Sequence, residues 1–161
     1  MTVNQTSVSL DDAQRVIAAG QAKATEIESP SNIAVVDAGG NLVAHVRMDG
    51  AWIASIDISI NKAFTARALD VSTEDLAANA GPGEQFYGIH ASNAGRIMIF
   101  TGGVPLRHNG QVVGAVGVSG GTGGAGQDRR RGGRGGAVSG GLRRQVRERI
   151  DRATSNIPTL L

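Results

Sequence analysis

The sequence contains no cysteine, so disulfide bonds and thiol chemistry are excluded. Its three histidines, His45, His90 and His108, are scattered, and none has carboxylates at a spacing typical of a structural zinc site. No apolar run approaches the roughly 20 residues of a membrane span, and the N-terminus lacks the basic and apolar regions of a signal peptide. We therefore expect a cytoplasmic protein without membrane contact.

Aromatic residues are also scarce, since Phe, Tyr and Trp together make up 3% of the 161 residues. A chain of this length is expected to form one domain. A small domain with few aromatic side chains buries a modest core, and association with further copies buries more apolar surface. The composition therefore predicts a homo-oligomer.

Positive charge is concentrated at the C-terminus, although the net charge is only +2. Residues 1–126 carry seven basic and eleven acidic side chains, a net charge of −4, whereas residues 127–161 carry nine arginines and three acidic side chains, a net charge of +6. We predict a domain over residues 1–121 and a Gly/Arg-rich basic tail over residues 122–161. Nucleic-acid binding by the tail is not expected, because no Phe or Tyr lies among its arginines for base stacking.

The segment from Asn32 to Asp49 predicts a β-hairpin. Residues 33–36 form a short apolar run, and residues 37–41 supply the Asp, Gly and Asn that a tight turn needs. Residues 42–48 then alternate between an apolar face and a face that includes His45 and Arg47. A hairpin this apolar needs a partner surface, so we place it at the centre of a sheet.

Helices are predicted on both sides of this hairpin in the sequence. Ser9 is a favourable N-cap with Asp12 three residues later, which predicts a capping box. Further helices are predicted over residues 51–68 and 70–78, and strands over residues 96–100, 104–107 and 111–119, the last two joined by an Asn-Gly turn. The order of elements predicts an α+β fold in which helices pack on one face of an antiparallel, five-stranded sheet.

Five motifs carry a resemblance to a known family. They are Asn32–Leu42 (NIAVVDAGGNL), Arg47–Ala51 (RMDGA), Lys62–Ala66 (KAFTA), Gly102–Leu106 (GGVPL) and Gly114–Gly121 (GAVGVSGG). In this order and spacing the chain resembles the HbpS/GlcG family, which includes the C-terminal domain of PduO-type proteins. The resemblance implies a profilin-like α+β sandwich that forms oligomers, and haem or corrinoid-type binding in some members.

The tail departs from the family pattern. Family members usually continue after the last motif with an alanine- and glutamate-rich helix, whereas here a run of glycine and arginine follows. Two explanations stay open. The tail is either a genuine basic segment, disordered because its composition cannot bury a core, or the product of a shifted reading frame, in which GC-rich alanine codons read as arginine or glycine.

His90 is the first candidate for a metal ligand. It lies in a long glycine-bearing segment over residues 79–95, and segments of this length in compact domains are often functional. Haem iron accepts a neutral imidazole, so His90 is a candidate axial ligand. An ordinary polar loop histidine is the alternative.

Charged and glycine-bearing positions predict the rest of a ligand site. Arg47, Asp49 and Lys62 could bind a small anion or a propionate, with Thr65 one helical turn beyond Lys62, or they could form a structural ion-pair network. In Thr101-Gly102-Gly103 the glycines suggest close approach to a flat ligand or to a neighbouring strand. We expect these positions to converge on one pocket, with the His90 segment as its lid.

The function expected from these features is binding of a small molecule by an oligomer, with haem as the first candidate cofactor. One alternative is an enzyme that acts on a small organic acid or aldehyde, with Lys62 as an amine or an acid–base group. Another is an accessory subunit that assists a neighbouring catabolic enzyme.

Overall fold

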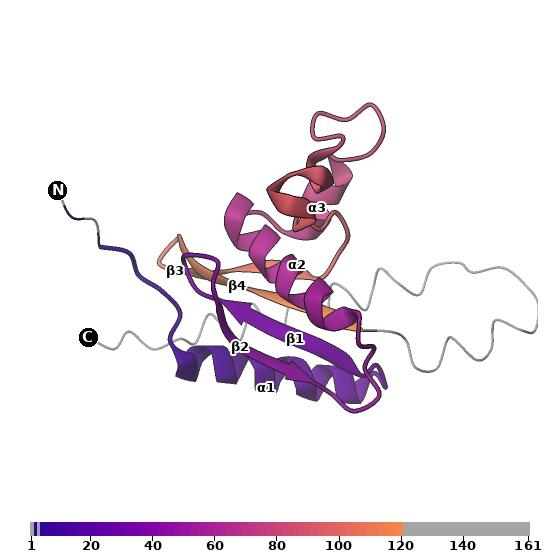
Figure 1. The fold of residues 1–161 in the computed structure, drawn as a ribbon. Helices are drawn as coiled ribbons and strands as arrows, with labels where there is room; N and C mark the ends of the chain where they lie inside the picture. The colour runs from indigo at the N-terminus through magenta and orange to yellow at the C-terminus, as the bar shows by residue number, and fades with distance from the viewer. Residues whose placement is uncertain (1, 3, 121–161) are drawn as a thin grey trace, which may run out of the picture.

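The computed structural model describes residue 2 and residues 4–120, so the predicted tail over residues 122–161 lies outside the described residues. The fold is α+β, and its strands form one antiparallel sheet in the order β2-β1-β4-β3 (Figure 1). The elements are α1 (Leu10–Glu26), β1 (Ser31–Val36), β2 (Leu42–Arg47), α2 (Ser55–Leu69), α3 (Thr73–Ala78), the 3-10 turns η1 (Ile89–Ala91) and η2 (Asn93–Gly95), β3 (Gly103–His108) and β4 (Gln111–Gly120). Whether the sandwich is profilin-like stays a prediction.

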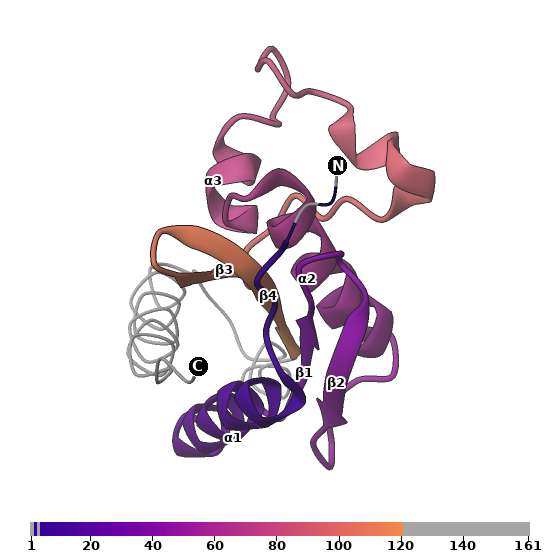
Figure 2. The ribbon, with the colours of Figure 1, turned by 90° about the vertical axis from the view of Figure 1, so that its left-hand side faces the viewer.

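The sheet separates the two long helices, so the prediction that the helices share one face is wrong (Figure 2). α1 packs on β1 and β2, and α2 packs on β4, β1 and β3. The reason lies in β1, which is buried along its whole length. Ile33 and Val35 belong to the core under α1, whereas Ala34 and Val36 belong to the core under α2. A strand that is apolar on both faces requires a cover on both.

The layer under α2 is built from small residues. Its core consists of Ala34, Val36, Ala63, Ala66 and Ala115. Gly117 of β4 lies directly under the helix backbone, where a Cβ atom would overlap the Ser59 carbonyl oxygen. The backbone of α2 therefore approaches β4 more closely than any side chain at this position would allow.

The sheet has four strands in the described part of the chain, not five, because residues 96–100 form no strand. Ile97 of this segment is buried, as its apolar character suggested. However, the backbone of the segment bonds to a helix side chain instead of a strand: the Thr65 hydroxyl donates to the Arg96 carbonyl oxygen (3.2 Å) and accepts from the Met98 N–H (2.9 Å). The Thr65 side chain thus bonds to two backbone groups that a neighbouring strand would otherwise bind.

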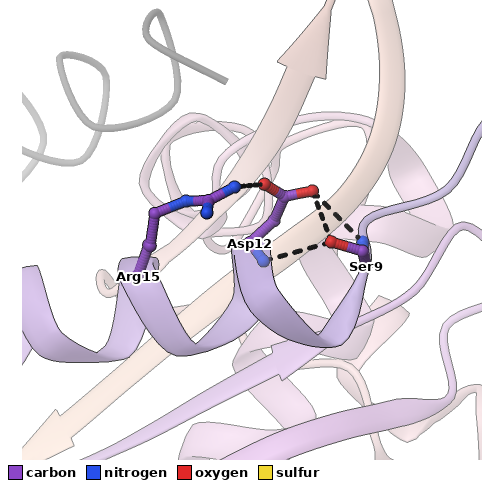
Figure 3. Close-up of polar contacts among 3 residues, drawn as sticks. All are labelled: Ser9, Asp12 and Arg15. Atoms are coloured by element: carbon purple, nitrogen blue, oxygen red, sulfur yellow. Dashed lines mark hydrogen bonds and ion pairs between the residues drawn. The ribbon is translucent and has the colours of Figure 1, made fainter. Parts of the chain in front are cut away.

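The N-terminus of α1 is fixed by the predicted capping box (Figure 3). The Ser9 hydroxyl accepts from the Asp12 N–H (3.2 Å), and the Asp12 carboxylate accepts from the Ser9 N–H (3.4 Å) and from the Arg15 guanidinium. Burial raises the pKa of Asp12, but the hydrogen bonds from Ser9 and Arg15 outweigh it and hold the pKa below its ordinary value.

We expect Ser9→Ala to lower the free energy of unfolding by about 1 kcal/mol, because the first turn of α1 loses its cap. Urea denaturation at pH 7 measures the change, with Thr6→Ala, a substitution at an exposed position, as the control.

The pKa of Asp12 is lower in the folded protein than in the unfolded chain, where it is about 3.9. The stability that ionised Asp12 contributes is therefore complete well above pH 3.9 and is lost as the pH falls below that value. A difference between Asp12→Asn and the parent that persists unchanged at pH 3 would contradict this account.

One long segment stands out from the sheet. Residues 79–95, which follow α3, project on the α2 side of the molecule (Figures 1 and 2). Short-range backbone hydrogen bonds hold the segment, among them Phe86 N–H to the Asn79 carbonyl (2.9 Å) and Ser92 N–H to the Ile89 carbonyl (2.9 Å). Phe86 and Tyr87 are exposed on it. We call residues 79–95 the arm.

Candidate functional site

A pocket of about 390 Å³ lies at the end of the sheet where β1 and β3 begin and β4 ends. This end of the sheet is at the right in Figure 1. α2 and α3 also begin here, so five elements of the fold meet around it. Its wall is formed by Ile27, Ser29, Ser31, Trp52, Ser55, Ile58, Lys62, Ser72, Glu74, Phe100, Thr101, Gly102, Gly103, Val104, Val118, Ser119 and Gly120. Four predicted site residues are among them: Lys62, Thr101, Gly102 and Gly103.

Among the described residues, Lys62 is the basic side chain that lines this pocket, and it is only 5% exposed. Its Nζ donates to the Val118 carbonyl oxygen (3.2 Å) and lies 4.4 Å from the centroid of the Phe100 ring. A cation over an aromatic face is attracted to it, more strongly where water is excluded. These contacts hold the amine at a defined position in the wall.

Gly102 and Gly103 make room for Lys62. Gly102 has a φ of +124°, which favours glycine, and a Cβ there would lie 3.0 Å from the Lys62 Nζ and would overlap the Val118 carbonyl oxygen. A Cβ on Gly103 would overlap the Lys62 carbonyl oxygen and lie 2.6 Å from the Thr73 Cγ2 atom. The close neighbours of these glycines in the described structure are therefore α2, α3 and the end of β4, so their absent side chains have a structural reason independent of any ligand.

Thr65 does not line the pocket. It is fully buried one turn along α2, where its single hydroxyl proton is shared between the Asn61 carbonyl oxygen (2.7 Å) and the more distant Arg96 carbonyl oxygen (3.2 Å). With its further bonds to Arg96 and Met98, the side chain anchors the segment that leads to Phe100. Thr65 therefore positions part of the pocket wall from outside it.

Arg47, Asp49 and His90 are not part of the pocket wall in a single copy of the chain. Arg47 ends β2 at the surface, and its Nε donates to the Ala51 carbonyl oxygen (3.1 Å). Asp49 is exposed in the turn that follows, and His90 is exposed in η1 of the arm. The structure thus brings together Lys62 and residues 101–103 but not the other predicted positions.

Sequence reasoning missed most of the wall. Six of the buried polar side chains of the described residues line this pocket, namely Lys62 and five serines: Ser29, Ser31, Ser55, Ser72 and Ser119. Serines are common in turns and caps, so nothing in their spacing singles them out. The sequence shows only that Trp52 and Phe100 are two of five aromatic residues. Their signal comes from the structure, where 65% of Trp52 and 47% of Phe100 are exposed.

His45 is a separate polar feature on β2. Its Nε2 is buried and has no hydrogen-bond partner among the described residues. Burial lowers the pKa of His45, which favours the neutral imidazole.

Within the described part of the chain, no three His, Cys, Asp or Glu residues lie close enough together to hold a metal ion. No helix of that part is long and apolar enough to span a membrane.

Comparisons with solved structures find this fold repeatedly. Klebsiella pneumoniae protein ORFY superposes with a TM-score of 0.81 and 34% identity, and the match covers 98% of this chain and 97% of that one. A PduOC–haem complex gives a TM-score of 0.74 and 25% identity over 92% of this chain and 95% of that one. A double mutant of HbpS from Streptomyces reticuli gives a TM-score of 0.71 and 25% identity, and the match covers 94% of this chain and 89% of that one.

Sequence relatives point the same way. An uncharacterized 15.0 kDa protein from the dhaT–dhaS intergenic region of Citrobacter freundii is 47% identical over 116 residues, which are 72% of this chain and 82% of that protein. GlcG of Escherichia coli K12 is 38% identical over 107 residues, 66% of this chain and 77% of GlcG. The family model described as "Haem degrading protein HbpS-like" matches residues 8–129. The chain therefore belongs to the HbpS-like family, as the five sequence motifs indicated.

Proposed function

We propose that this protein binds haem in the pocket beside Lys62. The observation that carries the proposal is the make-up of the pocket: an ammonium group and exposed aromatic rings share one largely apolar wall. The likeness to a PduOC–haem complex and membership of the HbpS-like family support haem over other flat ligands.

The residues of the pocket suit the two ends of a haem. The macrocycle is flat and apolar, and the wall offers Trp52, Phe100 and Val104. The propionates are anionic, and Lys62 is the basic side chain that lines the described part of the pocket. Bound haem would supply an iron that takes axial ligands and can undergo redox chemistry.

One copy of the chain does not supply a histidine as the axial ligand of the iron. No histidine lies in the described part of the pocket wall, whereas Thr101 does. His90 can act as the ligand if the arm of a neighbouring copy reaches over the pocket. We propose this shared arrangement and therefore a homo-oligomer, with Thr101 of the same copy as the alternative ligand.

Exposed aromatic side chains support the assembly. The chain has five aromatic residues, and four of them are exposed: Trp52 and Phe100 at the pocket, and Phe86 and Tyr87 on the arm. Aromatic residues are enriched in protein interfaces.

Sedimentation at micromolar concentration is expected to give a mass well above the 16.5 kDa of one chain. A measured mass equal to that of one chain would contradict a site shared between copies.

We expect His90→Ala to weaken haem binding and to shift the Soret maximum, because it would remove the axial imidazole. Absorbance titration with haem measures both effects, and His108→Ala, a histidine at the end of β3 away from the pocket, is the matched control. If Thr101→Ala shifts the maximum and His90→Ala does not, the ligand comes from the same copy. If neither changes the spectrum, both ligand assignments are wrong.

A further inference from the structure

The chain contains two lysines, Lys23 and Lys62, and both are buried. They differ in their surroundings. The Lys23 Nζ lies 2.6 Å from the Glu26 carboxylate on α1, outside the pocket wall. Lys62 lines the pocket, at the end of an apolar wall that includes Ile58, Val104 and Val118.

A lysine amine held in an apolar pocket is the arrangement that proteins use for covalent chemistry with carbonyl compounds. The Lys62 amine is fixed by the Val118 carbonyl oxygen and the Phe100 ring, at 3.2 Å and 4.4 Å. Gly102 lacks the side chain that would crowd Nζ on the loop side. The side chain is therefore both ordered and adjacent to space that a small molecule can occupy.

We propose that Lys62 captures small aliphatic aldehydes as an imine. The inference rests on the same pocket as the haem proposal but does not depend on haem. Its ligand class follows from the wall: apolar side chains suit a short hydrocarbon chain, and serine and threonine hydroxyls suit a carbonyl oxygen and the hydroxyl formed from it.

The step balances without a cofactor. The lone pair of the neutral Lys62 amine forms a C–N bond to the aldehyde carbon, and the C=O π electrons move to oxygen, which gives a carbinolamine after proton transfer from nitrogen to oxygen. The C–O bond then breaks, the hydroxyl leaves as water with one added proton, and nitrogen loses its remaining proton as the imine forms. Water can supply the proton that leaves with the hydroxyl and take up the proton that nitrogen loses, and Glu74 is the carboxyl group of the described pocket wall.

The test uses the full chain, butanal and sodium cyanoborohydride, which reduces an imine to a stable secondary amine. Peptide mass spectrometry of the parent protein locates the adduct. We expect Lys62 to be labelled roughly tenfold or more faster than Lys23, with a rate that rises with pH because the neutral amine is the reacting form. Equal rates at Lys62 and Lys23, or labelling confined to Lys23 and the N-terminal amine, would overturn the proposal.

Two variants sharpen the result. Lys62→Arg should abolish the rapidly formed lysine adduct, and Lys23→Arg should leave that adduct unchanged. Loss of the rapid adduct in Lys23→Arg but not in Lys62→Arg would overturn the assignment. The mapping of the parent protein decides the matter even if Lys62→Arg does not fold. Prior addition of haem should slow labelling at Lys62 if both ligands use the pocket; rapid labelling in a protein that gives no Soret band would support the aldehyde site and reject haem binding.

Discussion

Gly117→Val is expected to cause the largest loss of stability of any single change considered for this fold. A Cβ at Gly117 would overlap the Ser59 carbonyl oxygen and lie 2.5 Å from the Ala63 backbone nitrogen, so the obstacle is helix backbone and not a movable side chain. Overpacking of a well-packed core costs roughly 1–3 kcal/mol and occasionally more, and we expect the upper end or beyond. Thermal unfolding should show a midpoint lower by about 10 °C or more.

Gly81→Ala is the matched control for that change. Gly81 has an ordinary φ, and the nearest atom to an added Cβ is the Glu84 Cγ at 3.9 Å, so its free energy of unfolding should change by less than about 0.5 kcal/mol. If Gly117→Val melts like the parent, α2 does not rest on β4 as described. The pocket would then lose its basis too, because Lys62 reaches it from α2.

Lys62→Ala should have the largest effect on ligand binding. The substitution removes the basic group of the described pocket wall, and a hydrogen bond to a charged group contributes about 1.5–3 kcal/mol, which corresponds to a dissociation constant for haem roughly 10 to 100 times higher. The Soret maximum should stay where it is, because Lys62 is assigned to a propionate and not to the iron.

Lys23→Ala is the control for charge, since it also removes a buried lysine but one that lies outside the pocket wall. Its haem affinity should match that of the parent. Equal affinities for Lys62→Ala and the parent would reject the propionate assignment. A shifted Soret maximum in Lys62→Ala would instead place the amine at the iron.

Local features of the fold could be predicted because short-range physics decides them. The Ser9–Asp12 capping box needs only residues three apart, and the Asn109–Gly110 turn needs two residues that tolerate positive φ, which both adopt. The buried position of β1 followed from an apolar run without alternation. In each case the residues that determine the structure are neighbours in the sequence.

Long-range relations were harder to predict. Residues 96–100 have the composition of a strand, but their backbone bonds at Arg96 and Met98 to the side chain of Thr65, about 30 residues earlier. The apolar pattern of β1 fits a cover on one face or on two, and only the packed structure shows α1 and α2 on opposite faces. Propensity indicates burial in such cases but does not identify the partner.

The site was predictable only in part for the same reason. Lys62 and residues 101–103 stood out by charge and by glycine content, and the fold brings them to one pocket. Trp52 comes from the loop before α2, Ser72 from the cap of α3 and Ser119 from the end of β4. No periodicity connects these positions, because their proximity arises from the sheet and not from any one element.

The most direct test of the central claim, that haem binds beside Lys62, is an anomalous difference map at the iron absorption edge from crystals of the full chain grown with haem. The account predicts one iron peak per pocket, within the space bounded by Lys62, Phe100 and Trp52. An iron peak away from this pocket, or no peak in crystals of protein that is saturated with haem in solution, would contradict it.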